Sequence, residues 1–127
     1  MTYQKILIAD DDPLILSSIT QGLTQAGYHV LSAIDGQMAV EIGLAQRPKL
    51  AVLDIRMPGM SGIKAASQLR EAAGIQSLFL SAYTDKDIVE HATREGALGY
   101  LVKPISTNQL IPAIEAALQR AAELKIL

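Results

Sequence analysis

Short apolar runs alternate with segments of helical spacing along the whole chain, and this alternation restricts the fold more than any other feature. Ile6–Ala9, Leu50–Leu53 and Leu78–Leu80 are apolar at every position, as strands buried on both faces are. Tyr28–Ser32 and Leu98–Val102 are weaker strand candidates. Five strands in strict alternation with five helices predict one parallel sheet with helices on both faces.

The segments between the strands carry apolar residues at the spacing of one helix face. The two clearest faces consist of Leu16, Ile19, Leu23 and Ala26 in the first helix and of Leu110, Ile114, Ala117, Leu118 and Ala121 in the last. Capping signals agree with these boundaries. The N-cap candidates are Asp12 (followed by Pro13), Asp35, Ser61, and Ser106 with Gln109 as a capping box. Gly27 and Gly96 follow the first and fourth helices as C-cap candidates, and Pro58, Gly59 and Gly62 are expected in a turn.

Length and composition exclude several classes of protein. The chain has 127 residues, half of them hydrophobic, which fits a single domain that spans residues 1–127. The net charge of −2 and the absence of Trp argue against nucleic-acid binding by this domain. No apolar run approaches the length of a membrane span, and the absence of Cys together with an N-terminus unlike a signal peptide favours a cytoplasmic protein.

Polar residues gather where the predicted strands end. Asp10 and Asp11 follow the first strand, Asp54 the third, Ser81 the fourth, and Lys103 stands shortly after the fifth. Open parallel sheets bind their ligands at this edge. Three carboxylates, a hydroxyl and an ammonium are therefore expected to converge there.

Clustered carboxylates repel one another unless a cation lies among them, and their oxygens suit Mg²⁺, with Mn²⁺ as the alternative. A metal and Lys103 together would neutralise the oxygens of a phosphoryl group, to which Ser81 can donate a hydrogen bond. Asp54, at the end of the middle strand, is the natural nucleophile for an acyl phosphate. Without metal, proximity is expected to raise the pKa of at least one of these carboxylates.

Four segments together resemble the successive signatures of response regulator receiver domains, the phosphoacceptor domains of two-component systems. These are "ILIADDDPLI", "LAVLDIRMPGMSGIKAASQLR", "LFLSAYTD" and "GALGYLVKPI", and they span nearly the whole chain. The resemblance implies a doubly wound, flavodoxin-like α/β fold with strand order 2-1-3-4-5. It also implies a switch that autocatalyses its own phosphorylation and dephosphorylation and is no conventional enzyme.

The resemblance also assigns roles to residues. It makes Asp54 the phosphoacceptor, Asp11 a direct metal ligand and Asp10 a ligand acting through water. The remaining roles fall on the backbone carbonyl of Arg56 as the third protein ligand, on Lys103 and Ser81 at the phosphoryl group, on Ser81 and Tyr100 as switch residues, and on a cis Lys103-Pro104 bond. The resemblance also implies that Arg56 and Tyr83 flank the phosphoryl site, at positions that influence the lifetime of the acyl phosphate in such domains.

Two other functions compete with this interpretation. Phosphatases of the haloacid-dehalogenase type also use a strand-end aspartate with Mg²⁺, but they need a second acid two residues later, where this chain has Arg56. A receiver-like domain that binds partners without phosphorylation is the other alternative. The complete set of Asp10, Asp11, Asp54 and Lys103 argues against it.

The expected partners follow from the resemblance. A histidine kinase or phosphotransfer protein would donate the phosphoryl group, and a surface of the fourth helix (about Asp85–Glu95), the fifth strand and the last helix would contact an output partner or form a homodimer. The C-terminal half is similar to receivers of the ANTAR antiterminator group and also to receivers attached to sensor kinases. The apolar Leu124, Ile126 and Leu127 fit either a helix that continues into a partner or an ordinary frayed terminus.

Overall fold

Strands and helices alternate as predicted. The computed structural model describes residues 4–82, 87, 90–91, 94 and 97–126. Its elements are β1 (Lys5–Ala9), α1 (Pro13–Gln25), β2 (His29–Ala33), α2 (Gly36–Gln46), β3 (Leu50–Asp54), α3 (Gly62–Ala73), β4 (Ser77–Ser81), β5 (Gly99–Val102) and α5 (Thr107–Ile126). The described part of the chain thus contains four complete helices. The predicted fourth helix and Gly96 lie largely outside it, although Asp87, Glu90, His91 and Arg94 are helical.

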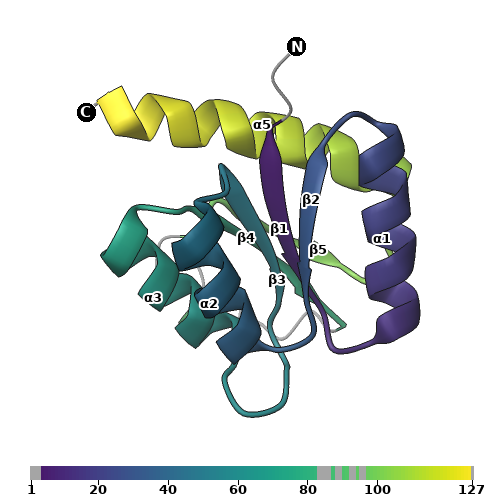
Figure 1. The fold of residues 1–127 in the computed structure, drawn as a ribbon, viewed down its shortest axis with the longest axis horizontal. Coiled ribbons are helices and arrows are strands. Elements are labelled where there is room, and N and C mark those ends of the chain that lie inside the picture. Colours follow the sequence, from purple (N-terminus) through teal and green to yellow (C-terminus); the bar gives the residue numbers. More distant parts are fainter. Residues whose placement is uncertain (1–3, 83–86, 88–89, 92–93, 95–96, 127) are drawn as a thin grey trace.

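The five strands form one parallel sheet in the order β2-β1-β3-β4-β5, which confirms the predicted flavodoxin-like topology. All strands point the same way, so their carboxyl ends share one edge, at the bottom of Figure 1. Strand β1 pairs with β2 on one side and with β3 on the other, so the order in which strands are added to the sheet reverses between β1 and β3. The crevice at this reversal is where such sheets bind ligands.

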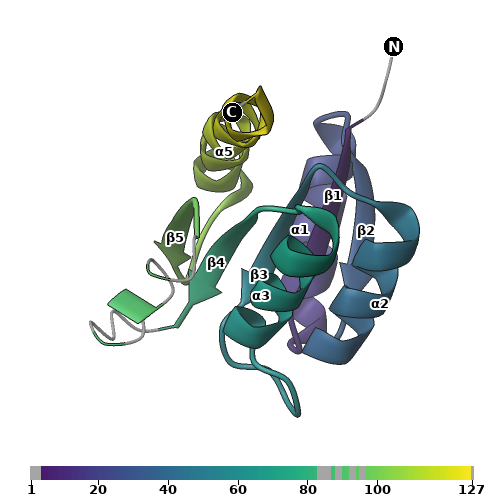
Figure 2. The same cartoon turned by 90° about the vertical axis from the view of Figure 1, so that its left-hand side faces the viewer.

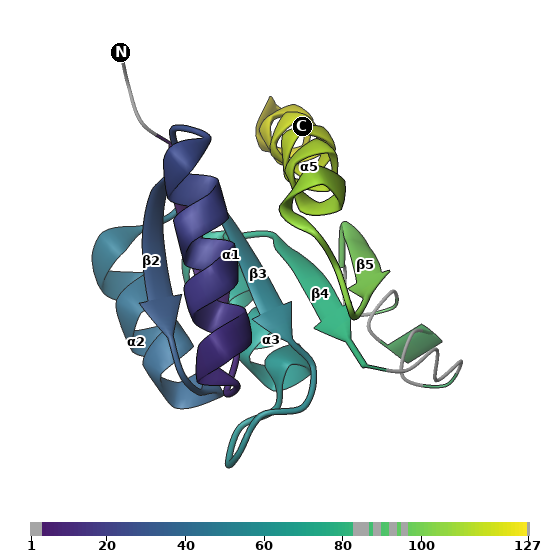
Figure 3. The ribbon, with the colours of Figure 1, turned by 90° about the vertical axis from the view of Figure 1, so that its right-hand side faces the viewer.

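Alternate residues of the central strands face two separate cores. Leu7, Leu53 and Phe79 pack with α2 and α3, whereas Ile8, Val52 and Leu80 pack with α1 and α5. Figures 2 and 3 show these two helical layers on opposite sides of the sheet. All of β1 except Lys5, and all of β3 and β4, are buried, which explains their uninterrupted apolar sequences.

The predicted helix caps are confirmed at three N-termini, and Ser106 and Gln109 exchange the hydrogen bonds of a capping box at the fourth. Asp12 Oδ1 accepts from Leu14 N at 2.9 Å, and Asp35 Oδ1 accepts from Met38 N at 2.8 Å. Two details of α1 differ from the prediction. Ala26 is the C-cap and is exposed rather than part of the buried face, and Gly27, with φ of 100°, stands one residue beyond it.

Helix α5 buries the predicted residues Leu110, Ile114, Ala117 and Ala121. It packs beside α1 on the same face of the sheet and runs across the strands near the ends at which they begin (Figure 1). No helix in the described residues combines the length and the apolar character that crossing a bilayer requires.

Candidate functional site

Backbone pairing beyond the strands holds the predicted polar residues at the carboxyl edge. Asp10 N donates to Ala33 O at 3.1 Å, and Ile55 N donates to Leu80 O at 3.0 Å immediately after Asp54. Lys103 N donates to Ser81 O at 2.7 Å, which ties the chain after β5 to the end of β4. Asp10, Asp54 and Ser81 are all buried. These backbone hydrogen bonds between neighbouring strand ends therefore fix the backbone at each of these positions.

Lys103 joins two carboxylates, one directly after β1 and one at the end of β3. Its Nζ lies 2.7 Å from Asp10 Oδ2 and 3.1 Å from Asp54 Oδ2. Burial disfavours the lysine charge, but the two carboxylates outweigh this effect and the pKa of Lys103 is raised. The lysine therefore stays cationic in the pocket. A single ammonium compensates two buried carboxylates only in part.

The third carboxylate completes a candidate metal site. One oxygen from each of Asp10, Asp11 and Asp54 lies within 4.8 Å of the others, which is close enough for one ion to contact all three. Asp11 is exposed while the other two are buried, so an ion can enter from solvent. Asp10 Oδ1 already accepts from Asp12 N at 2.9 Å. The donor set is hard and anionic and fits Mg²⁺.

The other predicted site residues lie in the loops and strands around this pocket. Arg56 is exposed in the loop that follows β3, two residues after Asp54. Tyr100 lies within β5, paired with Phe79, and is 42% exposed. The Lys103-Pro104 bond is cis, as expected. Tyr83 lies outside the described residues.

A sequence profile of the response regulator receiver domain matches residues 6–115. The chain belongs to this family. Receiver domains are phosphoacceptor modules of two-component signalling and not conventional enzymes. The transcriptional regulatory protein PdtaR of Mycobacterium tuberculosis is 40% identical over 125 residues, which cover 98% of this chain and 61% of PdtaR. This receiver domain thus spans less than two thirds of the length of that relative.

Solved structures agree with this assignment. A CheY-like receiver domain protein from Methanospirillum hungatei superposes with a TM-score of 0.90 at 26% identity, covering 96% of this chain and 98% of the other. A CheX-CheY complex from Borrelia burgdorferi with BeF3 and Mg²⁺ superposes with a TM-score of 0.84 at 26% identity, covering 90% and 88%. That complex therefore contains Mg²⁺ together with a beryllium fluoride.

The electrostatics of the receiver pocket centre on Asp54. Its pKa is raised to about 6, first because the carboxyl group is buried, and further by the charges of Asp10 and Asp11. The hydrogen bond and charge of Lys103 act in the opposite direction. The predicted rise is confirmed, but burial contributes more to it than the repulsion on which the sequence argument relied.

The raised pKa predicts how stability depends on pH in the metal-free protein. Between pH 3.8 and about 6 the folded state binds more protons at Asp54 than the unfolded state, so the free energy of unfolding decreases as pH rises. Lys103, whose pKa is also raised, contributes stability that is lost only in alkaline solution. We expect Asp54→Asn to stabilise the metal-free protein at pH 7.5 by on the order of 1–2 kcal/mol, and much less at pH 4.5.

Denaturant unfolding of both proteins in the presence of a chelator measures this difference. Asp35→Asn is a suitable control, because asparagine caps a helix as well as aspartate does. A difference between Asp54→Asn and the parent protein that is the same at both pH values would contradict the role of Asp54 protonation.

Sequence reasoning misplaced one residue near the site. Gly62 was expected in the turn with Pro58 and Gly59, but it is buried and begins α3 directly behind the Asp54 carbonyl. A glycine in the first turn of a helix carries no signal that distinguishes such a contact from a flexible turn.

Proposed function

We propose that this receiver domain, residues 1–127, is a phosphorylation-dependent switch that accepts a phosphoryl group on Asp54 from the phosphohistidine of a kinase or phosphotransfer protein. The observation that carries the proposal is the pairing of a buried Asp54 with Lys103 at 3.1 Å, beside the metal-binding arrangement of Asp10 and Asp11. A partner of this kind places the domain in the cytoplasm.

Each residue of the pocket has a chemical task in this transfer. A carboxylate oxygen of Asp54 forms a bond to phosphorus, the bond from phosphorus to the imidazole nitrogen breaks, and that nitrogen keeps the electron pair. Because the nucleophile must be ionised, the positive charge of Lys103 favours the reactive form of a carboxyl group that burial would otherwise keep protonated. Lys103 and the Ser81 hydroxyl then contact the oxygens of the transferred group.

Mg²⁺ would be held by Asp11 and Asp54 directly, by Asp10 through water and by the backbone carbonyl of Arg56, with Mn²⁺ as a substitute. When bound, it supplies positive charge to the phosphoryl oxygens. The fit rests on three carboxylate groups that converge within 4.8 Å. A single lysine leaves that cluster with excess negative charge, which a divalent ion relieves.

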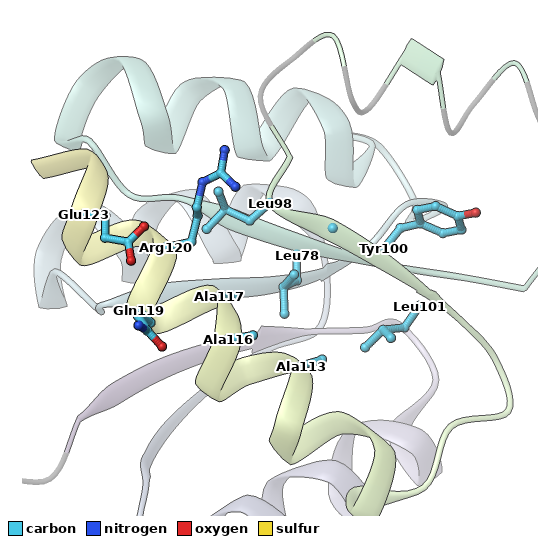
Figure 4. A pocket seen from close by; sticks show the side chains of 11 residues that line it. Leu78, Leu98, Tyr100, Leu101, Ala113, Ala116, Ala117, Gln119, Arg120 and Glu123 are labelled. Atoms are coloured by element: carbon cyan, nitrogen blue, oxygen red, sulfur yellow. The ribbon is translucent and has the colours of Figure 1, made fainter. Parts of the chain in front are cut away.

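In this proposal the output surface consists of β5, α5 and the predicted fourth helix (about 85–95), which lies largely outside the described residues. A groove of about 400 Å³ lies between β5 and α5, and Leu78, Leu98 and Leu101 are among the side chains that line it (Figure 4). Tyr100 points away from α5, with its hydroxyl outermost (Figure 4). On phosphorylation, Ser81 moves toward the new oxygens and the Tyr100 ring turns into the space that it leaves, which changes this surface for a second copy or an output partner.

We infer an output in gene regulation of the ANTAR type, in which an RNA-binding segment follows the receiver. The C-terminal half resembles that group, and PdtaR, which is longer than this chain, is named a transcriptional regulatory protein. The receiver itself contacts no nucleic acid in this proposal. Receivers attached to sensor kinases remain the alternative that the same resemblance supports.

A stable phosphoryl mimic tests the switch. We expect beryllium fluoride with Mg²⁺ to change amide chemical shifts or hydrogen exchange both around Asp54 and at Tyr100 and the neighbouring residues of β5. Mg²⁺ alone is the control, because it loads the pocket without adding phosphoryl-like oxygens. Changes confined to the pocket, with one Tyr100 orientation in both states, would contradict the switch even if Asp54 is phosphorylated.

A further inference from the structure

Gly62 packs directly against the backbone of Asp54. A Cβ atom added to Gly62 would overlap the Asp54 carbonyl oxygen, and it would lie 2.9 Å from the Asp54 carbonyl carbon and 3.1 Å from Ile55 Cα. These neighbours are backbone atoms at the end of β3, where Asp54 pairs with Leu80 of β4 and Ile55 N donates to Leu80 O, so they cannot turn away as a side chain would. Any larger residue must displace α3 or the end of β3.

Space, and not backbone conformation, requires glycine at this position. The glycines with positive φ in the described residues are Gly27, Gly59 and Gly74, and an added Cβ at each of these would meet nothing within 4 Å. Gly62 has a helical position and no positive φ, yet it is buried against Asp54. The lack of a side chain at Gly62 therefore allows α3 to pack against the Asp54 carbonyl group.

This contact closes the loop that carries Arg56. Gly62 N donates to Ile55 O at 2.8 Å, and Ile55 N donates to Leu80 O at 3.0 Å, so Ile55 is fixed through both of its backbone groups. Arg56 is the next residue. Ile55 therefore sets the position of the Arg56 backbone. The hydrogen bond that Ile55 accepts from Gly62 N in turn depends on how closely α3 approaches the end of β3.

A second glycine holds the same loop from the other side. A Cβ atom at Gly36, the first residue of α2, would lie 2.5 Å from Met60 O and 2.9 Å from Met60 Cβ. The loop between β3 and α3 is therefore confined between the first residues of two helices. Figure 1 shows this loop projecting at the carboxyl edge, below the starts of α2 and α3.

We propose that Gly62 is a positioning residue for the metal site, and that Gly36 supports it through Met60. By admitting α3 to van der Waals contact with the Asp54 carbonyl, Gly62 sets the backbone of Ile55 and Arg56 relative to the Asp54 carboxylate. This inference rests on the proposed function, in which Asp54 and the Arg56 carbonyl share one Mg²⁺. A displaced loop separates these two ligands while leaving all carboxylates present.

Magnesium affinity of the variant Gly62→Ala tests the proposal. We expect about 10-fold weaker Mg²⁺ binding by calorimetry, comparable to the loss of a group that orients a metal ligand. The matched control is Gly43→Ala, a buried glycine of α2 whose added Cβ would meet side chains and no backbone, with the end of the Leu69 side chain nearest and Leu7 Cδ2 at 3.6 Å. Circular dichroism and thermal unfolding establish that each protein is folded at the temperature of the titration.

If the substitutions only destabilise the fold, both variants should unfold at a lower temperature while their Mg²⁺ affinities stay unchanged. Unchanged affinity in a folded Gly62→Ala protein overturns the inference. If that variant does not fold, Gly36→Ala decides in the same way, with weaker binding expected and unchanged binding contradicting the role of the loop. An absence of Mg²⁺ binding in the parent protein instead contradicts the proposed function itself.

Discussion

Replacing Asp54 by asparagine is expected to abolish the phosphoryl adduct that the parent protein forms with a small acyl phosphate and Mg²⁺. The amide keeps the shape of the side chain and can still accept a hydrogen bond from Lys103, but its oxygen lacks the negative charge needed to attack phosphorus. Asp54 is the last residue of the central strand β3 and is only 6% exposed. The intact mass of each protein before and after incubation measures the adduct.

Two other acids provide the comparison that makes this result specific. Asp12→Asn and Asp35→Asn remove carboxylates at the same edge of the sheet and keep the helix caps, because asparagine caps as well as aspartate. Both variants should be phosphorylated like the parent protein. An adduct that persists in Asp54→Asn would show that another group accepts the phosphoryl, and the assignment of Asp54 would be wrong.

The fold was predictable because the sheet is buried on both faces. A strand such as β3 then carries consecutive apolar residues, here from Leu50 to Leu53, and the caps at Asp12, Asp35 and Ser61 mark where three of the helices begin. The weaker patterns were those of β2 and β5, whose residues are only partly buried. Even there the predicted boundaries agree with the structure to within one residue.

The candidate site was predictable as a set of residues but not as a set of distances. Parallel strands bring Asp10, Asp54 and Lys103 to one edge whatever the details of packing. The sequence does not show that Lys103 reaches both carboxylates at 2.7 and 3.1 Å, or that burial dominates the pKa of Asp54. Those features depend on how deeply the strand ends lie below the surrounding loops, which local patterns do not encode.

Replacing Asp11 by asparagine is expected to weaken Mg²⁺ binding by about 10-fold or more, since even groups that only orient a metal ligand are worth about that much. Asp11 is the exposed member of the carboxylate cluster, whereas Asp10 and Asp54 are already engaged by Lys103. It is therefore the acid with the most freedom to bind an ion directly. Its removal also lowers the negative charge that attracts the cation.

The neighbouring acid gives a matched control for this variant. Asp12→Asn removes the same charge one residue away, but the Asp12 side chain points into the N-terminus of α1, where its Oδ1 accepts from Leu14 N. Calorimetric titration with Mg²⁺ at low ionic strength should therefore show a large loss for Asp11→Asn and a small one for Asp12→Asn. Equal losses would mean that the cluster attracts the ion only by its summed charge, and Asp11 would then not be a ligand.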